Sequence, residues 1–183
     1  MTSAVKRTIY NSRYRPRLNP SLHQLTKPSL YRSLNFFQSP IRTMPTYLGS
    51  CFCHDIEYEL SLSSPDDART SLCHCRSCKK AFGTNYGLTA KIPKGALRLT
   101  KGAPKEHVAD NGSGSLVHRE FCSNCGSFIC EYGDAVKDQF RYLCVGSLDD
   151  PEVLPPKGEF FCSSRASWMP EVPDVFHKQK IKE

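Results

Sequence analysis

Three cysteines within six residues, Cys73, Cys75 and Cys78, constrain this chain more than any other feature of its sequence. Thiols spaced one and then two residues apart can converge on a single metal ion, and such spacings are typical of zinc sites. Two further pairs have the same spacings, so seven of the ten cysteines fall into three clusters. The clusters are Cys51 with Cys53, then Cys73 with Cys75 and Cys78, and finally Cys122 with Cys125.

The seven thiols divide into a set of four and a set of three. A structural zinc takes four protein ligands, whereas a catalytic zinc keeps one position for water or substrate. Cys51, Cys53, Cys122 and Cys125 make a complete four-thiolate set, which would clamp an early strand to a late hairpin. The other three cysteines have no fourth cysteine at a comparable spacing. They predict a second zinc whose open position suits a thiol, because zinc accepts soft sulfur ligands.

The cysteine spacings are also compatible with two different kinds of site. Both zinc sites could be structural, with His74 or one of the three remaining cysteines completing the second. An iron–sulfur cluster also needs three or four thiolates, although these spacings match none of the common ferredoxin patterns. Placed between two ligands, His74 is predicted to point away from the metal. We expect Cys130, Cys144 and Cys162 to be small buried side chains within strands.

The positive charge of the chain is concentrated at its N-terminus. Residues 1–44 hold eight Lys and Arg residues and no Asp or Glu, which leaves 17 of the 25 basic residues against all 18 acidic ones. The body is therefore nearly neutral, and its composition does not indicate a nucleic-acid-binding domain. No apolar run approaches the roughly 18 residues that span a membrane.

The basic segment 1–44 predicts a disordered leader whose composition is typical of a mitochondrial presequence. A plain basic tail, a nucleic-acid-binding arm, or a translation start at Met44 are the alternatives, and the last would favour a cytoplasmic protein. No apolar stretch of the secretory type follows the N-terminus, so a reducing compartment with bound zinc is favoured over disulfides.

Short segments of alternating polarity predict a mostly β fold. Ile56, Tyr58, Leu60 and Leu62 alternate with polar residues, which is the pattern of a strand with one wet face. Helical spacing is limited to two short segments, 29–37 in the basic leader and 76–82, and we expect the second to end at Gly83. These patterns predict a folded domain over residues 46–170 and a polar, mobile tail over 171–183.

Six motifs, taken in order, resemble the glutathione-dependent formaldehyde-activating enzyme family, which includes centromere protein V. The motifs are Gly49-Ser50-Cys51-Phe52-Cys53, Tyr58-Glu59, Cys73-His74-Cys75-Arg76-Ser77-Cys78-Lys79-Lys80, Phe121-Cys122-Ser123-Asn124-Cys125-Gly126, Gly146-Ser147-Leu148-Asp149-Asp150-Pro151 and Ser164-Arg165-Ala166-Ser167-Trp168. The resemblance covers residues 46–170. It implies an Mss4-like fold of several small antiparallel sheets, a structural zinc on the set of four, and a second zinc at the active site on the set of three.

The same resemblance implies a carbon–sulfur lyase that acts on a glutathione adduct of formaldehyde, or on an adduct of another thiol with a small electrophile. It assigns no catalytic residue beyond the second zinc site. Lys79, Lys80 and Arg165 are candidates to bind the carboxylates of glutathione, because cationic side chains match them. The alternative is a non-catalytic binding or scaffold module in which both zinc ions are structural.

Overall fold

Two β-sheets make up most of the structure, a computed structural model that describes residues 44–112 and 114–181. The predicted leader, apart from Met44, lies outside the described residues. The smaller sheet is antiparallel, with the order β1–β2–β5. Its strands are β1 (Thr46–Ser50), β2 (Glu57–Ser61) and β5 (Leu97–Lys101). The prediction of a mostly β protein is confirmed.

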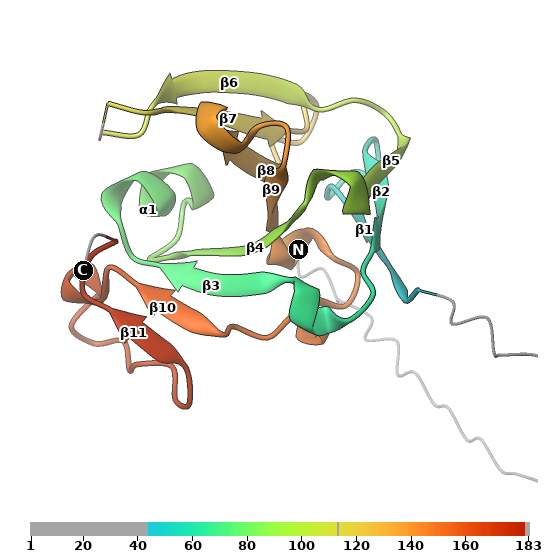
Figure 1. The fold of residues 1–183 in the computed structure, drawn as a ribbon. Coiled ribbons are helices and arrows are strands. Elements are labelled where there is room, and N and C mark those ends of the chain that lie inside the picture. Colours follow the sequence, from blue (N-terminus) through green and yellow to red (C-terminus); the bar gives the residue numbers. More distant parts are fainter. Residues whose placement is uncertain (1–43, 113, 182–183) are drawn as a thin grey trace, which may run out of the picture. The chain divides into compact units, whose positions relative to one another are not determined.

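The larger sheet has eight strands in the order β11–β10–β3–β4–β9–β8–β7–β6 (Figure 1). Its strands are β3 (Arg69–Cys73), β4 (Gly87–Pro93), β6 (Lys105–Asp110), β7 (Leu116–Phe121), β8 (Phe128–Gly133), β9 (Phe140–Cys144), β10 (Gly158–Phe160) and β11 (Phe176–Lys178). Most neighbours are antiparallel, but β10 pairs in parallel with both β3 and β11. The sheet is therefore mixed, a property that alternation of polarity along single strands does not reveal.

Helical structure is brief in the described part of the chain. The α-helix α1 spans Arg76–Phe82 and ends at Gly83, whose φ of 65° is left-handed, as the sequence predicts. Six single-turn 3-10 helices connect the strands, at Pro65–Asp67, Lys94–Ala96, Asp134–Val136, Val145–Ser147, Pro151–Val153 and Cys162–Ser164. None of the helices described here has the length and hydropathy that crossing a bilayer requires.

The hydrophobic core draws on both sheets. In β2, Tyr58 and Leu60 are buried while their neighbours along the strand are partly exposed, which confirms the predicted alternation. The Tyr58 hydroxyl lies 2.7 Å from Ser147 Oγ, so its polar end is satisfied inside the core. The largest apolar side chains around it are Ile56, Ile92, Ile129, Leu143, Val145 and Leu154.

The strand β11 lies in the stretch that the sequence assigns to a polar, mobile tail. Phe176, His177 and Lys178 pair with Gly158, Glu159 and Phe160 of β10, so residues 176–178 are an edge strand rather than a free end. Only three residues take part, and their partner strand comes from an earlier part of the chain. A local polarity pattern cannot reveal so short a strand, because its stability comes from its neighbour.

A cluster of charged and aromatic side chains lies across β6, β7 and β8, at one edge of the larger sheet. His118 lies between two carboxyl groups, with Nδ1 3.1 Å from Glu106 Oε1 and Nε2 3.1 Å from Asp134 Oδ1. Its ring stacks on Tyr132 at 4.7 Å. The hydrogen bond with Glu106 raises the pKa of His118. The Tyr132 hydroxyl, and then His118, lower the pKa of Glu106.

We expect this cluster to stabilise the protein most strongly between about pH 4.5 and 6.5. The raised pKa of His118 means that its contribution is complete below its unfolded-state value of 6.5 and is lost as the pH rises through the folded-state value. The lowered pKa of Glu106 makes its contribution complete above 4.5 and lost on further acidification. Thermal melts of wild type and His118→Gln across pH 4.5–8.5 should show a difference that shrinks at the alkaline end. A difference independent of pH would contradict this account.

Candidate metal centres

Cys51, Cys53, Cys122 and Cys125 meet as the sequence predicts. One sulfur from each lies within 4.8 Å of the others. Two of the sulfur–sulfur distances are 3.6 Å, between Cys51 and Cys53, and 3.7 Å, between Cys53 and Cys122. A tetrahedron with zinc–sulfur bonds of about 2.3 Å has edges of roughly 3.8 Å, so this set fits zinc. A disulfide would need about 2.05 Å, and all ten cysteines are free thiols.

The turn that carries Cys122 and Cys125 has the backbone of a metal-binding knuckle. It connects β7 to β8, and the Gly126 N–H donates to Cys122 O at 2.9 Å. Gly126 has a φ of 76°, a conformation that costs glycine little, which accounts for a glycine after the second cysteine. The Ser127 hydroxyl lies 3.2 Å from Cys125 Sγ. The Ile56 N–H donates to Cys51 Sγ at 3.3 Å. Such donors stabilise thiolates, as metal binding requires.

Cys73, Cys75 and Cys78 form a second group, again with their sulfur atoms within 4.8 Å of one another. Cys73 is the last residue of β3, Cys75 is the N-cap of α1, and Cys78 lies in the first turn of that helix. The Cys78 N–H donates to Cys75 Sγ at 3.3 Å. All three residues are partly exposed.

The three thiols of this group influence one another strongly. Hydrogen bonds from Cys73 and then Cys78 hold the pKa of Cys75 well below its usual range. The bond with Cys75 raises the pKa of Cys73, and the bonds with Cys73 and Cys75 raise that of Cys78. One thiolate is thus stabilised at the expense of the other two. If all three thiols were ionised, their negative charges would repel one another, and a divalent cation would offset that repulsion. The chemistry of the three donors therefore fits a metal ion.

The close approach of α1 to β4 depends on Gly87, which pairs with Cys73 in the sheet. A β-carbon at this position would come within 2.8 Å of the Phe82 ring and 3.1 Å of Cys78 Cβ. The ring of Phe82 also packs edge-on against Phe128 of β8, with 4.7 Å between centroids. A side chain at position 87 would therefore displace the helix that carries Cys78.

His74 does not belong to the group of three. It is fully buried, with ring Nε2 2.7 Å from Glu159 Oε1 and Nδ1 3.4 Å from the carbonyl oxygen of Asn85. Both ring nitrogens therefore face oxygen atoms of the protein, and neither is directed at the thiols. The prediction that His74 points away from the metal is confirmed.

The remaining cysteines do not complete the second site either. Neither group of possible metal ligands among the described residues contains Cys130, Cys144 or Cys162. Cys130 and Cys162 are buried as predicted, whereas Cys144 is partly exposed. Cys162 begins a 3-10 helix and is not in a strand, contrary to the prediction. The group of three therefore has no fourth cysteine or histidine ligand from the described part of the chain.

Two of the three predicted glutathione-binding residues are held by other parts of the protein. Arg165 Nε lies 3.2 Å from Glu159 Oε1 and Arg165 Nη2 lies 3.5 Å from Glu171 Oε2. Lys79 Nζ donates to Ser164 O at 2.5 Å. Lys80 is exposed and forms no ion pair with any residue that the structure describes.

The structure adds a charged pair, Arg119 with Glu131, that none of the sequence motifs contains. It lies beside the segment Cys73–Cys78, here called the metal loop. Arg119 of β7 donates from Nε to Glu131 Oε2 at 3.1 Å and from Nη2 to Ser77 Oγ at 2.8 Å. Burial, and in smaller part Cys75, raise the pKa of Glu131, while Arg119 lowers it. No local pattern could have marked these residues, because their partner Ser77 is more than forty residues distant.

Comparison with known proteins identifies the family of this chain. The family model described as glutathione-dependent formaldehyde-activating enzyme matches residues 46–164. An uncharacterized lyase of Schizosaccharomyces pombe is 29% identical over 86 residues, which is 47% of this chain and 57% of the relative. A Fusarium vanettenii protein named "Putative glutathione-dependent formaldehyde-activating enzyme" is 29% identical over 122 residues, 66% of this chain and 56% of the relative. A Penicillium rubens protein of the same name is 30% identical over 94 residues, 51% of this chain and 47% of the relative.

The matched region covers only part of each relative. The chain spans about half the length of the curated relatives that it matches. A crystal structure of a Rhodobacter sphaeroides protein is similar with a TM-score of 0.44 and 22% identity, over 58% of this chain and 94% of that one. The family model, in contrast, covers both cysteine sets and more than half of the chain. The chain therefore belongs to the glutathione-dependent formaldehyde-activating enzyme family.

Proposed function

We propose that this protein is a zinc-dependent carbon–sulfur lyase that acts on a glutathione adduct of formaldehyde, or on an adduct of a related thiol and a small electrophile. The observation that carries the proposal is the group of three. Cys73, Cys75 and Cys78 are partly exposed residues that offer three sulfur ligands to one ion, and no fourth cysteine or histidine among the described residues joins them. The set of four, in contrast, is complete and partly buried, as a structural site should be.

The two sites would have different tasks. Cys51, Cys53, Cys122 and Cys125 would hold a structural zinc, and Cys73, Cys75 and Cys78 a second one. When bound there, zinc would lower the pKa of a thiol in the fourth position, and its three thiolate ligands would make it weak in polarising a carbonyl group. The chain itself orients the sulfur ligands, since α1 and β3 fix the positions of Cys75 and Cys73.

The proposed reaction is balanced without any redox partner. In the forward direction the glutathione sulfur attacks the carbonyl carbon of formaldehyde and a carbon–sulfur bond forms. The carbonyl π electrons move to the oxygen, which takes up the proton that the thiol has lost. In the reverse direction the carbon–sulfur bond breaks, and the hydroxyl proton returns to the sulfur. Nothing is oxidised or reduced in either direction.

The residues around the group of three suggest how the thiol substrate is held. Arg119 reaches the Cys73–Cys78 loop through Ser77, but its guanidinium is mostly buried and already paired with Glu131 at 3.1 Å. Lys80, exposed on α1, is the one predicted anchor that is not engaged by a described residue. We therefore propose Lys80 as the anchor for a glutathione carboxylate, with Arg119, Arg165 and Lys79 retaining their contacts within the protein.

A direct assay tests the function. Protein loaded with two zinc ions should form the hydroxymethyl adduct of glutathione at least about a hundredfold faster than the spontaneous reaction, a factor within reach of positioned proton transfer. Nuclear magnetic resonance exchange measurements with labelled formaldehyde can follow both directions. 2-Mercaptoethanol, which has the thiol and lacks the carboxylates, is the matched control substrate and should be slower. If fully loaded protein gives only the spontaneous rate, the lyase proposal fails and a scaffold with two structural zinc ions becomes the better account.

A further inference from the structure

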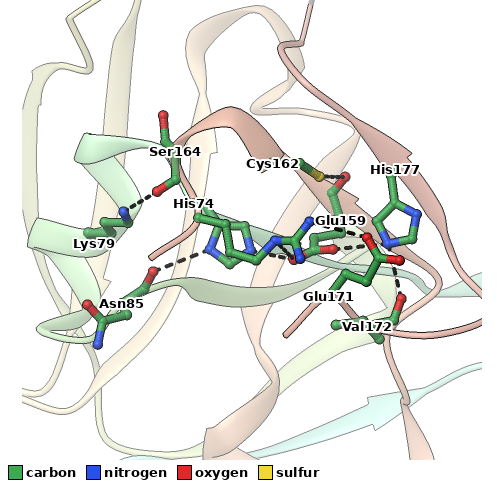
Figure 2. Close-up of polar contacts among 10 residues, drawn as sticks. His74, Lys79, Asn85, Glu159, Cys162, Ser164, Glu171, Val172 and His177 are labelled. Carbon is green, nitrogen blue, oxygen red and sulfur yellow. Dashed lines mark hydrogen bonds and ion pairs between the residues drawn. The ribbon is translucent and has the colours of Figure 1, made fainter. Parts of the chain in front are cut away.

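Glu159 lies without exposed surface in β10, among three side chains that carry basic nitrogens. Its Oε1 is 2.7 Å from His74 Nε2 and 3.2 Å from Arg165 Nε, and its Oε2 is 3.1 Å from His177 Nε2. Figure 2 shows His74 and His177 on opposite sides of Glu159. A buried carboxyl group is costly unless it is well partnered, and these nitrogens surround Glu159 on both of its oxygens.

The contacts of Glu159 are not equivalent. His74 Nε2 makes an aligned hydrogen bond at 2.7 Å. His177 Nε2 is close to Oε2 but makes its hydrogen bond with the carbonyl oxygen of Val172, at 3.0 Å. Glu159 Oε2 and Arg165 Nε each lack an aligned hydrogen-bond partner. This holds although Oε2 lies 3.1 Å from His177 Nε2 and Arg165 Nε lies 3.2 Å from Glu159 Oε1. The hydrogen bond with His74 is thus the directional contact of Glu159, and the Arg165 guanidinium adds an electrostatic one.

The hydrogen bond between His74 and Glu159 connects β10 to the middle of the metal loop. His74 stands between Cys73 and Cys75, and its backbone N–H donates to Phe160 O at 3.0 Å. In the parallel pairing of β10 with β3, Phe160 lies opposite Cys73. The loop is therefore fixed to β10 twice, once through the backbone and once through the imidazole. The second connection depends on the carboxyl group of Glu159.

We propose that Glu159 is a positioning residue for the second metal site. It acts through His74: the bond orients the imidazole away from the thiols and holds Cys73 and Cys75 at the separation that one metal ion requires. Arg165 and His177 contact the same carboxyl group, and His177 belongs to β11. The strand β11 therefore supports the metal loop indirectly, through Glu159. This inference rests on the proposed function, because it assumes that the group of three binds a metal ion.

The test compares the two metal sites within one molecule. Full-length wild type and Glu159→Gln, each loaded with zinc, are titrated with a chelator, and native mass spectrometry counts the ions that remain. Alkylation with iodoacetamide and peptide mapping then show which cysteines have lost their metal. Glu159→Gln keeps one oxygen that can face His74 but loses the negative charge, and we expect the group of three to bind zinc roughly 10- to 100-fold more weakly, the usual effect of altering a group that orients a metal site. The set of four should be unchanged.

Two further variants separate positioning from general instability. Ile92→Ala creates a cavity at the end of β4 remote from Gly87, and should make the protein less stable without selective loss of either ion. His74→Phe removes the same contact from its other side while keeping a ring beside Tyr86, and should reproduce the selective loss if Glu159→Gln does not fold.

The outcomes distinguish the inference from the proposed function. Wild type with two ions and an unchanged ratio of the two affinities in Glu159→Gln or His74→Phe would overturn the inference alone. The same selective loss in Ile92→Ala would also overturn it. Wild type that binds a single zinc ion would overturn the proposed function and the inference together.

Discussion

Replacing Cys75 with serine should remove one of two bound zinc ions and lower thiol-adduct turnover at least about a hundredfold, the range that a catalytic proton-transfer site contributes, while the domain stays folded. Cys75 is the central ligand of the group of three. It is also the N-cap of α1, where its sulfur accepts from the Cys78 N–H. Serine is among the preferred N-cap residues, so the helix should survive the substitution although the ligand is lost.

Native mass spectrometry, circular dichroism and the adduct assay together measure this prediction. Cys144→Ser is the matched control, because it makes the same chemical change at a partly exposed thiol outside both groups. It should keep both ions and full turnover. Unchanged turnover in Cys75→Ser with one ion lost would show that the second site is not catalytic. Global unfolding of Cys75→Ser would show that the site is structural.

Replacing Cys122 with serine should have the opposite effect, a loss of most of the stability of the domain. Cys122 is buried, and with Cys53, 69 residues away, it connects the end of β1 to the turn between β7 and β8. Structural zinc sites contribute roughly 10–16 kcal/mol of apparent binding free energy in small domains, which is comparable with the ~5–15 kcal/mol total stability of a typical protein. Losing one of four ligands therefore removes a large part of what holds the two sheets together.

Thermal melts with and without a strong chelator measure this effect. We expect Cys122→Ser to be largely unfolded at room temperature, or to melt far below wild type, and to be little affected by further chelation. Wild type stripped of metal should behave in the same way. If Cys122→Ser melted no lower than Cys144→Ser, the set of four would not be a structural metal site.

The cysteine spacing carried most of the information about the metal centres. The division of seven thiols into four and three follows from the sequence, and the structure brings together the same two groups. Local patterns also located α1 with its end at Gly83 and the alternating strand β2. These predictions succeeded because metal-binding turns, helix caps and amphipathic strands are encoded by residues close together in the chain.

Contacts between distant segments were beyond such reasoning. Arg165 was predicted to bind substrate, but in the structure it lies against Glu159 and Glu171. Arg119 lies in an ordinary strand pattern, and only the fold brings it to Ser77. Whether a cationic side chain is free for a ligand depends on which acidic groups the tertiary structure places beside it.

By itself, the sequence determined which thiols could share an ion, because Cys-x-Cys and Cys-x-x-Cys turns are local geometry. The sequence predicted that His74 points away from the metal, but only the tertiary structure reveals what holds it there. Its ring is held by Glu159, 85 residues later, and by the backbone of Asn85. The physical reason is that a buried imidazole binds the partners that packing puts within reach, and the parallel pairing of β10 with β3 sets those partners.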